Sequence, residues 1–254
     1  SLTVFHRETA AVLKKIEEAD YEFVFVDDGS SDKTLEIIKE IAAEDSHVRY
    51  VAFSRNFGKE AGMYAGLSEA SGDYMVIMDA DLQHPPALLP AMYEAVSKEG
   101  YDLCGGLRMG REGDSKLRGI FSRAFYKMSK KLTHMDMSDG HGDFRMMNRK
   151  VAEAILEMKE YNRYMKGLFS FVGFDTKWIE YESVERVMGK SKWNFKSLFS
   201  YAFEGILSFS TAPLKLAGLI GCLLFAGGMT FMGINLIQSI GTNGAITGFD
   251  ILIF

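Results

Sequence analysis

The first part of the chain alternates between short apolar runs and longer stretches with apolar positions in helical spacing. The runs are rich in Val, Phe, Tyr and Met and predict buried strands at residues 23–28, 48–53, 74–79 and 101–106. Between them, the spacing predicts helices over residues 34–45, 58–70 and 87–98. Because each strand is followed by a helix, the pattern predicts an α/β domain with a mostly parallel sheet and helices on both faces.

The pattern is less regular between residues 107 and 194. Residues 114–132 predict a basic helix, and residues 142–149 predict a short strand that leads into a helix. Residues 176–186 predict one further strand.

The C-terminal part is apolar in two different ways. Residues 195–210 are amphipathic, which suits either a helix packed on the core or, as we favour, a helix in the membrane interface. Leu216–Ile237 carries no charge and would reach roughly 33 Å as a helix, enough to cross a bilayer core. A very hydrophobic buried helix is the alternative, but the glycines of this segment suit packing between membrane helices better.

Charge gives this segment an orientation. Lys190, Lys192, Lys196 and Lys215 precede it and nothing basic follows, so the positive-inside rule places the folded domain in the cytosol. We therefore expect four parts: a cytosolic catalytic domain (1–194), an amphipathic juxtamembrane helix (195–213), a first transmembrane helix (214–240) and the start of a truncated second one (249–254).

Composition excludes some classes of protein. The net charge of −5 argues against nucleic-acid binding, which usually needs a basic domain. Cys104 and Cys222 lie in different parts of the chain, so no disulfide framework is expected. His84, His134 and His141 do not form a zinc-binding spacing.

Acidic residues gather at the ends of predicted strands, as Asp27-Asp28, Asp79-x-Asp81 and Asp143. In an open parallel sheet, ligands bind beyond the carboxyl ends of the strands, where the first two clusters fall. Helix capping is the alternative for the first cluster, although it does not explain two adjacent carboxylates. Asp79 and Asp81 can share one hard cation, Mg²⁺ or Mn²⁺, with diphosphate oxygens completing its shell.

Two basic segments complete the candidate chemistry. The segment 104–134 carries eight Arg and Lys residues, which suit either a phosphate near an anionic membrane or a solvated helix face. The loop from Arg186 to Trp193 is basic and contains Gly189, and the same two interpretations stay open for it.

Five motifs occur in order along the chain: VDDGSSDKT, SRNFGKEAG, MDADLQHPP, GDFRMMNR and ERVMGKSKW. Together they resemble the polyprenyl-phosphate glycosyltransferases of family 2, which include dolichyl-phosphate mannose synthases and bactoprenol glucosyltransferases. The resemblance implies a GT-A fold followed by interfacial and C-terminal transmembrane helices, in the plasma membrane of a bacterium. The family usually opens with a strand that ends in a Pro-x-Tyr-Asn-Glu-like segment, and we expect residues 1–194 to lack that strand.

The resemblance also implies roles for individual residues. Those expected to bind the donor nucleotide-sugar are Asp27, Asp28, Gly29, Asn56, Gly58, Lys59 and Asp79. Those expected to hold the metal and diphosphate are Asp79, Asp81 and Gln83. Those expected near the acceptor phosphate are Arg108, Arg118 and Ser122. Arg186 and Lys192 are expected in a loop that closes the site, so the expected catalytic set is Asp79, Asp81, Asp143, Arg186 and Lys192.

The expected reaction is inverting transfer of a hexose from a nucleotide-sugar, with UDP-glucose first, to undecaprenyl phosphate. A phosphate monoester is largely dianionic at neutral pH and already nucleophilic, so we expect Asp143 to orient the acceptor rather than to act as an obligatory base. Open alternatives are UDP-N-acetylglucosamine, UDP-galactose or GDP-mannose as donor, a non-catalytic membrane scaffold with a degenerate transferase domain, and a haloacid-dehalogenase-like phosphatase. A homo-oligomer is left open, and the membrane is an expected partner.

Overall fold

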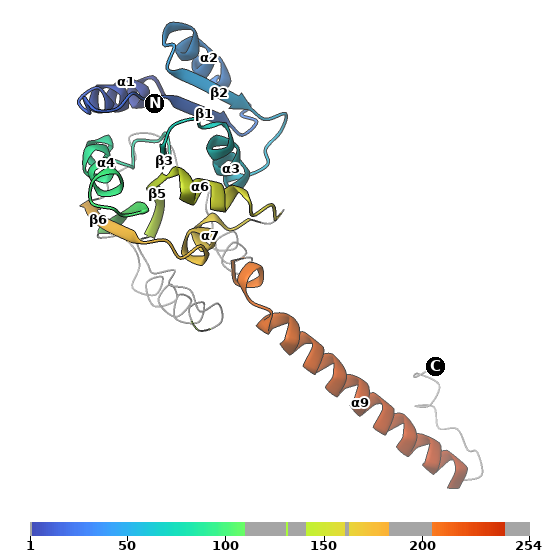
Figure 1. Cartoon of the computed structure of the whole chain (residues 1–254). Helices are drawn as coiled ribbons and strands as arrows, with labels where there is room; N and C mark the ends of the chain where they lie inside the picture. The colour runs from blue at the N-terminus through green and yellow to red at the C-terminus, as the bar shows by residue number, and fades with distance from the viewer. Residues whose placement is uncertain (1, 110–130, 132–140, 161–162, 183–204, 242–254) are drawn as a thin grey trace. The chain divides into compact units, whose positions relative to one another are not determined.

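The computed structural model describes residues 2–109, 131, 141–160, 163–182 and 205–241 (Figure 1). The chain forms two compact units, Ser1–Phe209 and Ser210–Phe254, which are described separately. The predicted basic helix (114–132) lies outside the described residues apart from residue 131. Most of the predicted juxtamembrane helix and the predicted second span (249–254) also lie outside them.

The first unit has the alternating order that the sequence predicted. Its N-terminal elements are α1 (Leu2–Leu13), β1 (Phe23–Asp27), α2 (Thr34–Glu44), β2 (Val48–Ala52), α3 (Lys59–Glu69) and β3 (Tyr74–Ile77). Its later elements are η1 (Pro86–Leu88), α4 (Leu89–Ser97), β4 (Leu103–Met109), β5 (His141–Asn148), α6 (Arg149–Leu156), α7 (Met165–Phe171) and β6 (Thr176–Glu182). All six predicted strands are present, whereas α1 and α7 were not predicted.

The strands form two sheets. β1 pairs with β2 in parallel, from Phe23↔Val48 to Asp27↔Ala52. The second sheet has the order β3-β5-β4-β6, and β4 and β6 are parallel. β5 runs antiparallel to both of its neighbours, β3 and β4. This reversed strand determines where Asp143 lies relative to the other carboxylates.

Helices cover β1 on both faces because its side chains alternate. Phe23 and Phe25 are buried in a cluster with residues of α1 and α2. Val26 points to the other face, where a Cβ on Gly66 of α3 would meet its side chain at 3.4 Å. The small residues of α3 thus allow the helix to approach the strand closely.

The second sheet is also covered on both faces. Phe144 and Met146 of β5 pack against Leu89 and Met92 of α4 in one buried cluster. Met147, the next residue of β5, belongs to another cluster that contains residues of α3, α6 and α7. Two layers of helices around the sheets give the predicted α/β architecture.

The second unit contains one long helix, α9 (Ala212–Gly241). Residues Ala212–Gln238 have a mean hydropathy of 1.8, and none of that stretch is buried within the chain. By length and composition this helix can cross a membrane.

Candidate active site

The first loop of the site follows β1. Asp27 ends the strand, is 3% exposed, and its Oδ2 accepts the backbone N–H of Ser30 at 3.3 Å. The Asp28 carboxylate accepts the backbone N–H groups of Phe57 at 2.6 Å and Gly58 at 2.9 Å. The Asn56 side chain donates to the Asp28 carbonyl at 3.2 Å. Asp28 and Asn56 therefore tie this loop to the one that precedes α3.

Glycine is required where these loops meet. Gly29 has φ +65°, and a Cβ there would lie 2.4 Å from the backbone carbon of Arg55. Gly58, which precedes the first residue of α3, has φ +95°. Both conformations are rare for residues with a Cβ, so the two glycines shape the loops that the family resemblance assigns to the donor.

The second loop follows β3 and contains the paired carboxylates. Leu82 has φ +66° and is the only non-glycine residue with positive φ in the described part of the chain. Such backbone strain persists only where surrounding contacts hold it, and it is concentrated at functional sites. Asp81 Oδ1 accepts the backbone N–H of Gln83 at 3.1 Å, which fixes the turn.

His84 supports this loop by linking the Asp79 backbone to the buried Phe144 ring. Its Nδ1 accepts the backbone N–H of Asp79 at 3.0 Å, and its ring stacks on Phe144 with centroids 4.9 Å apart. Burial is the largest influence on this imidazole and lowers the pKa of His84. A neutral imidazole with its proton on Nε2 is consistent with the hydrogen bond that Nδ1 accepts and with the lowered pKa. From the sequence, His84 was considered only as a metal ligand, and its supporting role was missed.

Lys59 joins three motifs that are far apart in the sequence. Its Nζ lies 2.8 Å from Asp79 Oδ1 and 2.7 Å from Asp143 Oδ2. Burial would lower the pKa of Lys59, but the attraction of Asp143 and Asp79 outweighs burial and raises it. The ammonium is therefore charged at any pH at which the protein works, and it holds the two carboxylates together.

Asp143 is the more enclosed of the two carboxylates that pair with Lys59. Its side chain is 11% exposed, and its Oδ1 is buried with no hydrogen-bond partner among the described residues. Burial would raise the pKa of Asp143, but the nearby charges of Lys166, Lys59 and Arg145 lower it. Asp143 is therefore an anion at neutral pH, held among cations.

Arg145 and Arg108 bring further positive charge. Arg145 is 3% exposed, donates to the Gly142 carbonyl at 3.0 Å, and lies over the rings of Phe169 and Trp178. Its burial lowers the pKa to about 10. The Arg108 Nε, on β4, is buried without a hydrogen-bond partner in the described part of the chain. A buried donor without a partner is costly and suits a ligand that supplies an acceptor.

The carboxyl and amide oxygens beyond β3 fit a divalent cation. Magnesium and manganese bind oxygen ligands, and Mg²⁺ is commonly held by one or two carboxylates together with substrate phosphates. Asp79, Asp81 and Gln83 supply such a set within five residues. No larger group of His, Cys, Asp and Glu in the described ranges is arranged to hold a metal alone.

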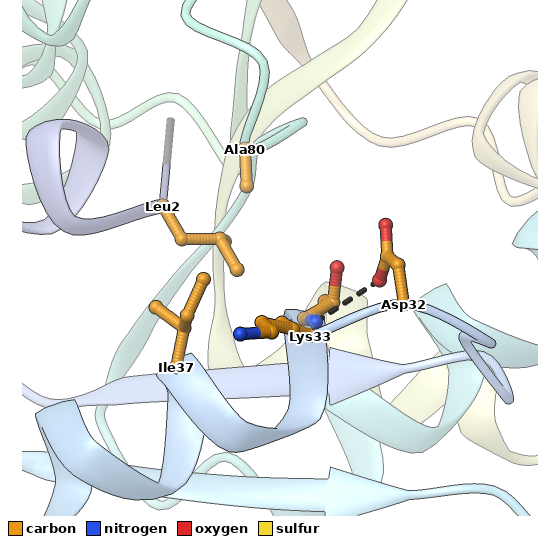
Figure 2. A pocket seen from close by; sticks show the side chains of 6 residues that line it. Leu2, Asp32, Lys33, Ile37 and Ala80 are labelled. Atoms are coloured by element: carbon orange, nitrogen blue, oxygen red, sulfur yellow. Dashed lines mark hydrogen bonds between the residues drawn. The ribbon is translucent and has the colours of Figure 1, made fainter.

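A cavity of about 500 Å³ adjoins this loop (Figure 2). Its walls are formed by Leu2, Asp32, Lys33, Thr34, Ile37 and Ala80. Ala80 stands between the paired carboxylates, and Asp32 Oδ1 accepts the backbone N–H of Thr34 at 3.0 Å. The cavity was not predicted from the sequence, because Leu2 comes from α1 and approaches Ala80 only in the folded chain.

The structure thus brings together many of the predicted residues. Lys59, Asp79 and Asp143 are in direct contact, and Asp28 connects with Asn56 and Gly58. The predicted residues that lie outside the described part are Arg118, Ser122, Arg186 and Lys192. Lys166 and Arg145, which act on Asp143, were missed; the only signal was an arginine within the apolar run of GDFRMM.

Comparison with known proteins agrees with this architecture. The sequence profile of Glycosyl transferase family 2 matches residues 6–156. CsbB of Bacillus subtilis, named as a glycosyltransferase, is 46% identical over 205 residues, which cover 81% of this chain and 62% of that protein. The bactoprenol glucosyl transferase of Shigella phage SfV is 39% identical over 91% of this chain and 74% of its own. The prophage bactoprenol glucosyl transferase homolog of Escherichia coli K12 is 35% identical over 100% and 82%.

A similar fold is found among solved structures. The crystal structure of a mycobacterial protein superposes with a TM-score of 0.53 and 18% identity, over 80% of this chain and 70% of that one. This similarity concerns the fold and agrees with the predicted GT-A architecture. Together with the profile match over more than half of the chain, the relatives establish that the chain is an enzyme of glycosyltransferase family 2 with a GT-A fold.

Proposed function

We propose that the chain transfers a hexose, with glucose from UDP-glucose as the first candidate, to a polyprenyl phosphate such as undecaprenyl phosphate. Relatives that align with nearly the whole chain are named for bactoprenol glucosyl transfer, which supports the lipid acceptor. The observation that carries the proposal is the ion cluster of Lys59, Asp79 and Asp143. It joins the loop assigned to the donor, the loop with paired carboxylates and the strand assigned to the acceptor.

A divalent metal, Mg²⁺ or Mn²⁺, would be held by Asp79, Asp81 and Gln83. When bound, it supplies positive charge that stabilises the departing diphosphate. Asp27 and Asp28, with Gly29, Asn56 and Gly58, would shape the nucleotide site by holding their loops in the conformations described above. The adjoining cavity has room for part of the nucleotide.

The main catalytic difficulty is electrostatic, because two anionic substrates must approach each other. Lys59 and Arg108 would offset this repulsion, since fixed charges in a site stabilise charge that develops in the transition state. Arg118 and Ser122 would bind the acceptor phosphate, and Arg186 and Lys192 would close over the site. The acceptor oxygen is already a nucleophile. Asp143, kept anionic by its neighbours, would orient Lys59 and the acceptor, and direct displacement at the anomeric carbon would invert its configuration.

We also propose that α9 spans the plasma membrane of a bacterium, with the folded unit in the cytosol. The length and hydropathy of Ala212–Gln238 support the span. The lysines that precede the span support the orientation. Residues 195–213 would lie along the membrane surface.

A panel of nucleotide-sugars tests the proposal. Purified full-length chain is incubated with undecaprenyl phosphate, Mg²⁺ or Mn²⁺ and each donor in turn, and the lipid product is identified by its mass. A hexose adduct with UDP-glucose is expected. A lipid-linked product formed instead from UDP-N-acetylglucosamine, UDP-galactose or GDP-mannose would identify that compound as the donor. Release of nucleotide without a lipid product, or no reaction with any donor, contradicts lipid transfer.

The metal assignment has its own test. Asp81→Ala is expected to lower the rate at least about 100-fold, comparable to removing one group that stabilises the leaving charge. Asp73→Ala, an exposed carboxylate that precedes β3, is the matched control and is expected to keep full activity. Undiminished activity of Asp81→Ala, or of the parent protein in EDTA, refutes the metal role.

A further inference from the structure

A buried tyrosine on β6 lies beside the arginine that the family resemblance assigns to the acceptor phosphate. β4 and β6 are parallel, and their register places Tyr181 opposite Arg108. Side chains at paired positions of neighbouring strands project from the same face of a sheet. Tyr181 is 8% exposed and belongs to the buried cluster that also contains Phe144 and residues of α4. The side chains of Tyr181 and Arg108 are therefore neighbours on the face of the sheet that α4 covers.

The ring of Tyr181 is held in place by its surroundings. A Cβ on Gly106 of β4 would lie 2.9 Å from an edge carbon of this ring, so the glycine leaves the space that the ring occupies. The ring also meets that of Phe144 edge to face, with centroids 6.1 Å apart. Phe144 in turn stacks on His84, which accepts the backbone N–H of Asp79. A row of three rings thus connects Tyr181 with the loop that carries the paired carboxylates.

The hydroxyl of Tyr181 lies within the electrostatic field of the site. Four charged side chains of the site act on it: Arg108, Asp79, Asp143 and Asp81. Burial is the largest influence and raises the pKa of Tyr181, and the carboxylates raise it further against the opposing effect of Arg108. Tyr181 therefore keeps its proton at neutral pH and can donate a hydrogen bond.

The two neighbours together suit a ligand with several acceptor atoms. The Arg108 Nε is buried and has no hydrogen-bond partner among the described residues. A buried donor left unpaired costs free energy, which a bound acceptor would recover. Tyr181 provides a second donor next to it. A phosphate group is such a ligand, because it presents several strong acceptor oxygens and its charge attracts a guanidinium.

The order of the strands indicates which phosphate this is. β3, whose loop carries Asp79 and Asp81, is one edge of the second sheet, and β6 is the other. Three strand spacings separate them, about 14 Å. β3, β4 and β6 nevertheless run in the same direction, because β5 is antiparallel to both β3 and β4. Tyr181 and the metal loop are therefore at the same end of the sheet but at opposite edges. This separation favours the acceptor phosphate over the diphosphate of the donor.

We propose that the Tyr181 hydroxyl donates a hydrogen bond to the phosphate of the lipid acceptor, beside Arg108, and is thereby a further catalytic residue of the transfer. This inference rests on the proposed function, which supplies the acceptor. One phosphate oxygen is held by the phenol and the guanidinium, and another attacks the anomeric carbon. The new carbon–oxygen bond forms as the bond to the nucleoside diphosphate breaks. Tyr181 keeps its own proton, so the phosphate remains anionic and nucleophilic.

Replacing Tyr181 by Phe removes the hydroxyl and keeps the ring. The matched control is Tyr93→Phe, because Tyr93 packs against the same buried cluster from α4. The full chain in detergent is titrated by calorimetry with farnesyl phosphate, a short acceptor analogue, with farnesol, and with UDP in the presence of Mn²⁺. We expect Tyr181→Phe to bind farnesyl phosphate roughly 10- to 100-fold more weakly than the parent, as for the loss of one hydrogen bond to a charged group. Its affinity for UDP should equal that of the parent, and Tyr93→Phe should match the parent with each compound.

Three results of the titrations overturn the proposal. The first is equal affinity of the parent and Tyr181→Phe for farnesyl phosphate, or no binding of that compound by the parent. The second is weaker binding of UDP alone, which assigns the hydroxyl to the donor. The third is an equal loss of affinity for farnesol and farnesyl phosphate, which shows that the phosphate is not the group recognised. Equal melting temperatures of the parent and both variants confirm that the proteins are folded.

Kinetics of transfer to undecaprenyl phosphate separate this inference from the proposed function. We expect Tyr181→Phe to lower kcat/KM for the lipid roughly 10- to 100-fold while KM for the nucleotide-sugar stays unchanged. Product formation by the parent with unchanged kcat/KM in Tyr181→Phe refutes the role of the hydroxyl while the transfer stands. Binding of farnesyl phosphate that depends on Tyr181, without any lipid product from the parent, refutes the transfer while the hydrogen bond stands.

Discussion

Replacing Lys59 by Met tests the ion cluster on which the site depends. The substitution keeps an unbranched side chain of similar length and removes the charge that lies 2.7 Å from Asp143 and 2.8 Å from Asp79. Asp143 would then be an anion at 11% exposure without its nearest cation. We expect the folded unit to lose stability and Asp143 to gain a proton more readily.

The size of the effect follows from the exposure of each partner. A hydrogen bond to a charged group contributes about 1.5–3 kcal/mol when it is shielded, as it is at Asp143. Lys59 and Asp79 are 43% and 38% exposed, so solvent screening reduces their pair to about 0.2–1 kcal/mol. The total is about 2–4 kcal/mol. For a unit of this size, each kcal/mol lowers the melting temperature by about 2–4 °C, which predicts a decrease of about 4–16 °C.

Differential scanning fluorimetry of the full chain in detergent measures this decrease, with Lys98→Met as the matched control. Lys98 also pairs with a carboxylate, Glu18 at 2.9 Å, but both side chains are more than half exposed, and no resolved change is expected. The low pKa of Asp143 means that its stabilising charge is present above the ordinary carboxyl range and is lost on acidification. The difference between wild type and Lys59→Met should therefore narrow as the pH falls. Equal melting temperatures of the two lysine variants at neutral pH would refute the role of the cluster.

Two further predictions concern the loops and the stability of the fold. Gly29→Ala, which combines φ +65° with a 2.4 Å approach to the Arg55 backbone, should lower the melting temperature clearly more than Gly100→Ala, where φ is +88° but nothing lies within 4 Å; equal decreases would contradict the close approach. Hydrogen bonds from His47 and His6 lower the pKa of Asp45 from 3.8 to about 2. The charge of Asp45 should therefore stabilise the fold fully above about pH 4, and this stabilisation should disappear as the pH falls through about 2. The urea midpoints of wild type and Asp45→Asn should accordingly converge near pH 2. A constant difference between them at every pH would contradict this assignment.

The sequence predicted the strands well because each strand is a run of apolar residues with a fixed period. Phe23, Phe25 and Val48 are buried where the pattern predicts a sheet. α7 was missed because its sequence, MKGLFSF, is short and contains a glycine, which is unfavourable in a helix. The structure shows why glycine is present: the Phe209 ring occupies the space of a Cβ at Gly167. Such a requirement arises from a residue 42 positions away in the chain and leaves no local signal.

The site was predicted as separate residues rather than as a cluster. Asp79 and Asp81 were identified because paired carboxylates after an apolar run have a known chemistry. Lys59 was assigned to the donor through the resemblance alone, and its contacts with Asp79 and Asp143 could not be foreseen. The role of His84 could not be predicted from the sequence either. Its Nδ1 accepts a hydrogen bond from the Asp79 backbone only because of the loop conformation, which includes a strained backbone at Leu82.

The direction of β5 explains how Asp143 reaches the other carboxylates. Asp143 is near the amino end of its strand, so in a fully parallel sheet it would lie at the edge opposite the loop that follows β3. β5 instead runs antiparallel to β3, with Ile77 opposite Arg145. Extending this register by two residues places Asp79 opposite Asp143, and the Lys59 ammonium lies within 3 Å of both. The single reversed strand therefore assembles the ion cluster, and strand direction is the property that an apolar run does not encode.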